Sequence, residues 1–171
     1  MRAVDSARIF LGGDIMMKKI IFLDIDGVLN SERYDRERTA QDGNIDESRL
    51  VLLKALADET GAEIVLISSW RKHWMPAGRE PDAIGRELNR TFGKYGLAIT
   101  DKTPVFASND RADEISAWLA AHEGTVKSFV ILDDRFGGWG ALSSHLVATN
   151  MRIGRGLEEK HVRLAVEILK S

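Results

Sequence analysis

The stretch that decides the fold is IIFLDIDGVL, residues 20–29. Its first four residues form an unbroken apolar run, which is typical of a strand buried on both faces in a parallel sheet. Asp24 and Asp26 follow directly, and their side chains point to the same side if the extended conformation persists. Gly27 then lets the backbone turn sharply and permits the close approach of a ligand. The stretch therefore predicts a buried strand that ends in a polar turn.

Strands and helices alternate along the rest of the chain. Further strands are expected at residues 63–67, 129–132 and 146–148, and helices at 47–60, from about 81 to 92, from about 110 to 123 and near the C-terminal end. This alternation indicates right-handed βαβ units. The predicted fold class is α/β, with a doubly wound, Rossmann-like parallel sheet.

Length and composition indicate one domain. The chain has 171 residues, of which 44% are hydrophobic, and this size allows one compact core. We expect that domain over residues 17–171, with a small lid that could form within residues 71–110. Residues 1–16 are expected to be an N-terminal tail, because their apolar stretch at residues 9–11 is too short for a signal peptide or a membrane span.

Charge and cysteine content limit the classes of partner. Basic and acidic residues nearly balance, at 24 and 26, so no strong overall field favours nucleic acid or an acidic membrane. The chain contains no cysteine, which excludes disulfides, a thiolate nucleophile and a cysteine-rich zinc site. These features favour a cytoplasmic protein without a membrane partner, and a monomer is the default expectation.

Three of the predicted strands end in polar or acidic residues, at residues 24–27, 68–69 and 133–134. Because the carboxyl ends of parallel strands meet along one edge of a sheet, we expect these groups to converge. Carboxylates gathered in one small site repel each other unless a cation lies among them. An all-oxygen set of ligands suits a hard ion, so the sequence predicts a Mg²⁺ site at this edge.

The same segments resemble a known family. Residues 24–29, DIDGVL, are similar to the first signature of the haloacid dehalogenase (HAD) superfamily of aspartyl-phosphate phosphatases, and residues 130–134 are similar to its acidic fourth motif. Ser68 and Arg111 stand where that superfamily has its second and third motifs. The resemblance covers residues 18–169 and implies a HAD-type hydrolase fold.

The resemblance also implies roles for five residues. Asp24 would attack phosphorus and form a covalent acyl-phosphate. Asp26 would protonate the leaving oxygen and later take a proton from the attacking water. Ser68 and Arg111 would hold the phosphoryl oxygens. The ligands of Mg²⁺ would be Asp24, the backbone carbonyl of Asp26, and Asp134.

Neighbouring residues offer alternatives for three of these roles. Asp133 could be the metal ligand in place of the next aspartate, although a supporting role beside the metal ligands suits it better. Ser69 could do the chemistry while Ser68 caps the following helix. Lys102 competes with Arg111, which could instead pair with acids in its own helix.

Two further segments resemble proteins that act on nucleic acids. Residues 67–71, ISSWR, and 131–134, ILDD, are similar to the HAD domains of bacterial RNA repair (Swiss Army Knife) proteins. Residues 133–135, DDR, also resemble the end-healing phosphatase domain of phage polynucleotide kinases. The resemblance implies that the phosphate at an RNA or DNA end is a candidate substrate.

Several features bear on how a substrate would bind. Gly27, Trp70 and Arg71 are candidate substrate contacts, although Trp70 and Arg71 could equally serve packing and surface pairing. Residues 71–102 hold seven cations against four acids, an excess that could steer a polyanion or simply form a solvated face. Only about twenty residues separate Asp26 from the first crossover helix, too few for a large cap. We therefore expect an open site with little or no cap.

The leading hypothesis is a Mg²⁺-dependent phosphomonoesterase that forms an aspartyl-phosphate. One alternative is a phosphatase of small sugar or nucleotide phosphates. Another is a non-catalytic binding module that keeps the HAD fold. The motifs GxxxxGK[ST], GxGxxG after a strand, and HExxH are all missing from the sequence, so kinase, dehydrogenase and zincin functions have no support.

Overall fold

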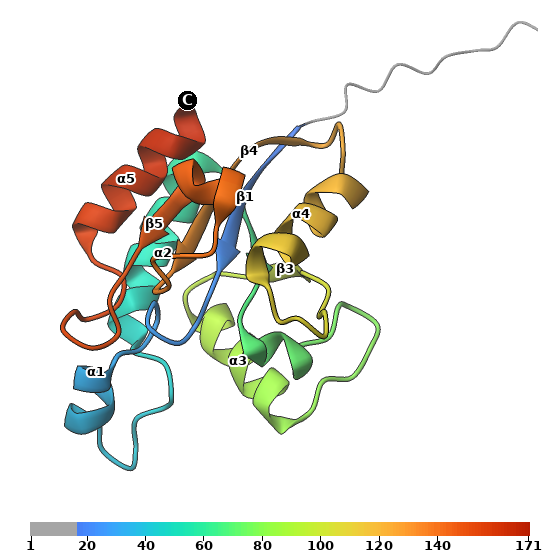
Figure 1. Cartoon of the computed structure of the whole chain (residues 1–171). Helices are drawn as coiled ribbons and strands as arrows, with labels where there is room; N and C mark the ends of the chain where they lie inside the picture. Colours follow the sequence, from blue (N-terminus) through green and yellow to red (C-terminus); the bar gives the residue numbers. More distant parts are fainter. Residues whose placement is uncertain (1–16) are drawn as a thin grey trace, which may run out of the picture.

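The computed structural model describes residues 17–171, and the N-terminal tail expected over residues 1–16 lies outside the described residues. The strands are β1 (Lys18–Leu23), β2 (Glu63–Leu66), β3 (Ile99–Lys102), β4 (Val126–Asp133) and β5 (Leu146–Ala148). The helices are α1 (Glu32–Glu37), α2 (Glu47–Thr60), α3 (Ala83–Lys94), α4 (Arg111–Ala121) and α5 (Glu159–Lys170), with short 3₁₀ helices η1 (Ser69–Lys72) and η2 (Gly140–His145). All strand pairs are parallel, which confirms the predicted α/β class (Figure 1).

Strand β1 lies at the centre of the sheet, whose order is β3-β2-β1-β4-β5. Leu23 pairs with Leu66 of β2 on one side and with Leu132 of β4 on the other. A central parallel strand is covered on both faces, which explains the continuous apolar run at its end. In this order the carboxyl ends of β1, β2 and β4 are neighbours. The polar residues that follow these three strands can therefore meet, as the sequence predicts.

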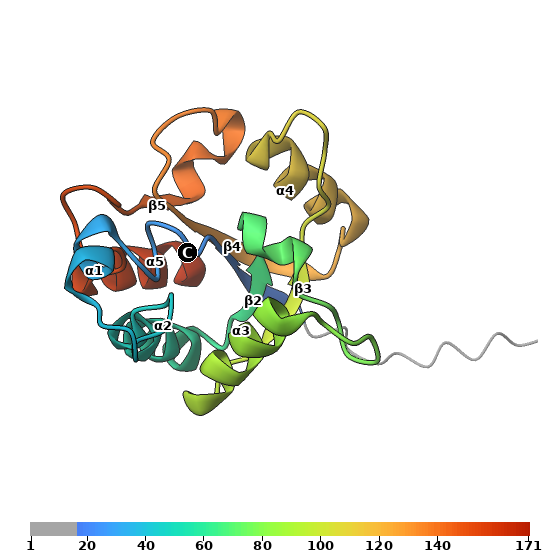
Figure 2. The ribbon, with the colours of Figure 1, turned by 90° about the horizontal axis from the view of Figure 1, so that it is seen from below.

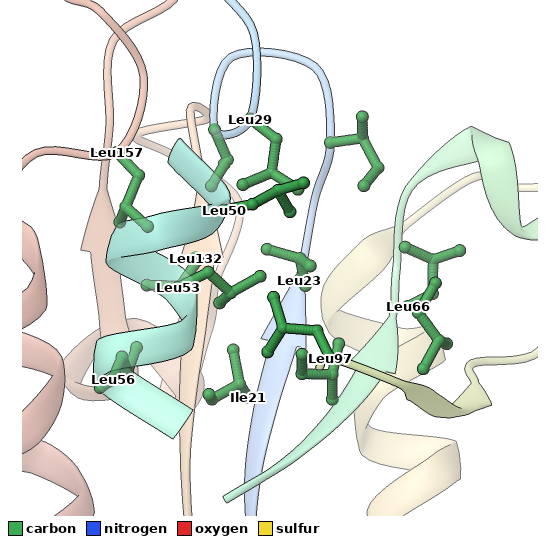
Figure 3. Close-up of a cluster of buried hydrophobic side chains, with 14 of the residues drawn as sticks. Ile21, Leu23, Leu29, Leu50, Leu53, Leu56, Leu66, Leu97, Leu132 and Leu157 are labelled. Carbon is green, nitrogen blue, oxygen red and sulfur yellow. The ribbon is translucent and has the colours of Figure 1, made fainter. Parts of the chain in front are cut away.

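Helices cover both faces of the sheet, as a doubly wound fold requires. Figure 2 shows α2 and α5 on one side of the sheet and α4 on the other. In the larger core cluster, Leu50, Leu53 and Leu56 of α2 point toward Ile21 and Leu23 of β1 (Figure 3). All five side chains are fully buried, and burial of a leucine typically contributes about 1.5–3 kcal/mol. Packing of α2 on the sheet therefore fixes the position of β1 and of the turn that follows it.

The structure confirms the caps predicted for α2 and for the start of α4, whereas α4 ends at Ala121, two residues before the predicted end. The Asp46 side chain accepts a hydrogen bond from Ser48 N at 3.0 Å, and Gly61, in the left-handed conformation, ends α2. Asp110 caps α4 by accepting from Ala112 N at 2.9 Å. Arg111 is therefore the first residue of α4.

Two elements, α1 and β3, are absent from the sequence-based expectation. Helix α1 has six residues and buries none of them, so it has no apolar periodicity to detect. Strand β3, ITDK, is a four-residue edge strand without an apolar run. Strand β3 and helix α3 are the strand and the α-helix that form within residues 71–110, the segment in which a small lid could form.

Among residues 17–171, no separate cap covers the end of the sheet that carries the polar turns. Residues 24–46 form only turns and the short α1 between β1 and α2. Lys18, at the start of β1, and Ser171, after α5, lie at the opposite end (Figure 1). Within the part of the chain that the structure describes, no helix has both the length and the apolar character to cross a bilayer.

Candidate active site

Backbone hydrogen bonds continue the sheet beyond β1 and bring the first polar residue into the site. Asp24 N donates to Leu132 O of β4 at 2.9 Å, and Ile67 N donates to Leu23 O at 2.9 Å. Asp24 is therefore held between the ends of β2 and β4, and only 2% of its surface is exposed. This is the convergence that the three polar strand ends predict.

Three carboxylates gather at this edge. One carboxylate oxygen from each of Asp24, Asp133 and Asp134 lies within 4.8 Å of the other two. Asp24 Oδ1 accepts from Ile25 N at 2.9 Å, and Asp133 Oδ1 accepts from Arg135 N at 2.9 Å. The structure thus places both aspartates at the end of β4 beside Asp24.

Arg111 bridges two of these carboxylates. Its Nη1 donates to Asp24 Oδ2 at 2.5 Å and also to Asp133 Oδ2. The competing cation lies elsewhere, since Lys102 Nζ donates to Arg71 O at 2.8 Å and to Trp74 O at 2.6 Å. Of the two, Arg111 is the residue positioned to contact a phosphate next to Asp24.

The electrostatics of the cluster favour an added cation. The pKa of Asp24 is raised from 3.8 to about 6, chiefly by burial and also by the charge of Asp133, against the opposing effect of the Arg111 guanidinium. Burial, and then the charge of Asp133, also raise the pKa of Asp134. One guanidinium therefore does not balance three carboxylates. A divalent ion with oxygen ligands fits the donor set, because the available atoms are carboxylate oxygens.

Asp26 has a different environment from the three clustered aspartates. Its Oδ1 accepts from Asn30 Nδ2 at 2.8 Å, and its Oδ2 accepts from Trp70 Nε1 at 3.1 Å. Its side chain is not in the cluster, so any contact with the metal would come from its backbone carbonyl, as the family resemblance implies. Asn30 was not identified from the sequence. Its position four residues after an aspartate, within a turn, is the signal that could have identified it.

Gly27 permits the close approach of the first and fourth motifs. It has a φ of +84°, and a Cβ atom placed there would lie 2.6 Å from Asp134 Cβ and Cγ. Its N donates to Asn30 Oδ1 at 2.9 Å, and its O accepts from Thr149 Oγ1 at 2.6 Å. The absence of a side chain at Gly27 is therefore needed for Asp134 to occupy its place.

Comparison with protein families decides the identity of the fold. A family model described as HAD domain in Swiss Army Knife RNA repair proteins matches residues 20–162. The chain belongs to this family. Comparisons with curated proteins and with solved structures found no match. Membership supports a HAD-type phosphatase in general terms, and the cluster of three aspartates could hold the metal that HAD enzymes generally use.

Ser68, which the resemblance places at the second motif, directly precedes the short helix η1. Ser68 is fully buried, and its Oγ accepts from Trp70 N at 3.3 Å, so it caps η1. Ser68 therefore caps the following helix, which is the alternative to a catalytic role that the sequence left open. Accepting this bond leaves the hydroxyl proton free for a phosphoryl oxygen. Ser69 is exposed at the start of η1 and remains an alternative donor.

Arg71 of the HAD domain is used inside the protein. Only 5% of its surface is exposed, and its Nη2 donates to Glu114 Oε2 at 2.6 Å. Its Nη1 donates to Ser68 O at 3.0 Å and also to Ile67 O. Arg71 is therefore paired within the protein, as one of the two predicted alternatives has it, but its partners are buried and not at the surface. Glu114 was not identified from the sequence, where an acid in the first turn of a helix has an ordinary capping explanation.

Proposed function

We propose that this HAD domain is a Mg²⁺-dependent phosphomonoesterase that forms an aspartyl-phosphate on Asp24. The observation that carries the proposal is the position of Asp24 within a cluster of three carboxylates, in direct contact with Arg111. A buried carboxylate next to a guanidinium and a potential metal site is suited to attack a phosphate held by the same cation.

The proposed reaction has two steps. In the first, a carboxylate oxygen of Asp24 forms a bond to phosphorus, the bond from phosphorus to the leaving oxygen breaks, and Asp26 gives its proton to that oxygen. In the second, Asp26 takes a proton from a water molecule, whose oxygen attacks phosphorus and releases the Asp24 carboxylate. Arg111 and the Ser68 hydroxyl hold the phosphoryl oxygens through both steps.

The metal and its ligands support the first step. Mg²⁺ held by Asp24 and Asp134 would offset the repulsion between carboxylates and a phosphate dianion. Asp133 has its oxygens occupied by Arg111 and by the backbone N of Arg135. Because Asp133 contacts Arg111 directly, whereas Asp134 lies against Gly27 in the turn that follows Asp24, we assign Asp133 the role of orienting Arg111 and Asp134 the role of metal ligand.

We further propose the phosphate at an RNA or DNA end as the substrate, ahead of small sugar or nucleotide phosphates. Two observations support this choice. The family to which the chain belongs is described by its occurrence in RNA repair proteins. In addition, residues 24–46 form no separate cap, so a large substrate can reach the site.

Hydrolysis of p-nitrophenyl phosphate tests the catalytic proposal. We expect release of p-nitrophenol that requires Mg²⁺, stops with EDTA and falls to background in Asp24→Asn, while Lys127→Ala, far from the site, keeps the parental rate. Release that is independent of metal and unaffected by Asp24→Asn would refute the mechanism.

A substrate panel tests the choice of substrate. We expect a higher kcat/KM with 3′-phosphorylated oligonucleotides than with sugar or nucleotide monophosphates, and the reverse order would remove the nucleic-acid assignment. Tight oligonucleotide binding without hydrolysis at any Mg²⁺ concentration would instead favour the non-catalytic binding module.

A further inference from the structure

A hollow of about 280 Å³ opens beside the site, on the side of Arg111. Its lining includes Ser69, Lys72, Asn109, Arg111 and Arg135. A second hollow of about 180 Å³ shares Asn109, Arg111 and Arg135 with the first and continues toward η2. We call the first of these the basic hollow.

The basic hollow carries two cations, Lys72 and Arg135, that form no ion pair among residues 17–171. Lys72 and Arg135 are exposed, and neither has a carboxylate oxygen within 4.0 Å among residues 17–171. Glu114, the acid in the lining, has one oxygen bound by Arg71 Nη2 at 2.6 Å and the other by Phe106 N at 2.9 Å. The acid is thus occupied, and the charge of Lys72 and Arg135 is available to an anion.

Three other basic side chains of residues 71–102 have partners within the protein. Arg71 is paired with Glu114, Lys94 Nζ lies 2.8 Å from Glu47 Oε1, and Lys102 donates to two backbone carbonyls. The basic excess of residues 71–102 therefore includes cations with structural roles. Lys72 is a cation of this segment that reaches the hollow next to the site.

Arg111 joins the basic hollow to the reaction centre. Its Nη1 contacts Asp24 and Asp133, and the same side chain forms part of the wall of the hollow. A phosphate attacked by Asp24 would therefore lie next to an anion bound between Lys72 and Arg135. Substrates in which a short linker joins two phosphates could occupy both positions at once.

We propose that the basic hollow binds a second phosphate of the substrate, which is not hydrolysed. This inference rests on the proposed phosphatase function and narrows it to substrates that carry a phosphodiester or a further phosphate monoester near the reacting group. In a nucleic-acid end, the internal phosphodiester supplies that anion. In a small molecule, a bisphosphorylated nucleotide supplies it.

The test compares matched substrates in the presence of Mg²⁺. The variants are Lys72→Ala, Arg135→Ala and the double variant, with Lys127→Ala as a control in which an exposed cation at the other end of β4 is removed. The substrates are p-nitrophenyl phosphate, thymidine 3′-monophosphate, thymidine 3′,5′-bisphosphate and a 3′-phosphorylated thymidine oligomer.

For the bisphosphate, the oligomer or both, we expect each substitution in the hollow to raise KM by about tenfold, the effect of losing one charge-assisted contact. The two substrates with a single phosphate should be unaffected, and Lys127→Ala should behave as the parent. An effect confined to the oligomer identifies the phosphodiester as the bound anion. Equal losses on all four substrates, or no loss on any, would overturn the proposal.

Failure of the phosphatase function has a separate signature. If the parent hydrolyses none of the four substrates, calorimetric titration with thymidine 3′,5′-bisphosphate tests the hollow alone. Weaker binding by the double variant than by the parent and Lys127→Ala would support the subsite. Equal binding by all three would refute it.

Discussion

Replacing Arg71 by methionine should destabilise the protein by about 3–5 kcal/mol, the usual cost of removing one partner from a buried ion pair. The side chains of Arg71 and Glu114 are 6% and 1% exposed, and their charged atoms lie 2.6 Å apart. Methionine fills much of the same volume but leaves the Glu114 carboxylate without a charge partner. The pair joins η1, which follows Ser68, to α4, which begins with Arg111.

A double variant separates the loss of charge balance from the loss of packing. In Arg71→Met/Glu114→Gln neither member of the buried pair is charged, and the glutamine oxygen can still accept from Phe106 N, as Glu114 Oε1 does at 2.9 Å. We therefore expect the double variant to be more stable than Arg71→Met alone by about 2 kcal/mol, because neighbouring substitutions of this kind are not additive.

An exposed pair provides the control. Arg33 Nε lies 2.8 Å from Glu37 Oε1, but the two side chains are 47% and 61% exposed. Arg33→Met should change the free energy of unfolding by less than about 1 kcal/mol, because exposed pairs contribute little. Urea unfolding followed by far-ultraviolet circular dichroism measures the parent, these three variants and Glu114→Gln, the second single variant that a test of additivity requires. A change below about 1 kcal/mol in Arg71→Met, or strictly additive effects in the double variant, would refute the reasoning.

Three further predictions concern the turn after β1 and helix α5. Gly27→Ala should cost at least about 1–2 kcal/mol from its positive φ and should displace Asp134, so both the urea midpoint and Mg²⁺-dependent hydrolysis should fall; unchanged values would contradict the close-approach argument. Asn30→Ala should lower kcat by about tenfold to a hundredfold with little change in KM, because Asp26 loses one of its two hydrogen-bond donors, and a change confined to KM would count against this role. Burial lowers the pKa of His161 below 6.5, so the unfolded state takes up this proton first as the pH falls. Stability should therefore decrease below about pH 6.5, and urea midpoints of His161→Gln between pH 5 and 8 should show a smaller decrease.

The sequence predicts the parts of the fold that depend on local pattern. The apolar run of β1 and the capping residues Asp46 and Gly61 of α2 are short-range features, and the structure confirms the elements that they define. Strand β3 escaped prediction because it forms an edge by pairing with β2, and its four residues carry no apolar run. Strand β3 joins the sheet through its contacts with β2, and the pattern of residues along the chain does not show these contacts.

The candidate site divides in the same way. The positions of Asp24, Asp134 and Arg111 follow from strand ends and a helix start, and the structure brings these residues to one edge. The bond from Trp70 Nε1 to Asp26 Oδ2 spans 44 residues, so no local pattern predicts it. The buried partner of Arg71, Glu114, is 43 residues away, so the sequence leaves Arg71 open between a substrate contact and a packing or pairing role.

The positions of Lys18 and Ser171 have a practical consequence for protein engineering. Both lie at the end of the sheet away from the three clustered aspartates, and Lys170 Nζ lies 2.7 Å from Glu59 Oε1 near the end of α2. A tag, a surface anchor or a second enzyme fused at either position would project away from the reaction centre. Immobilisation through these positions should therefore leave the aspartates accessible even to a long polymer.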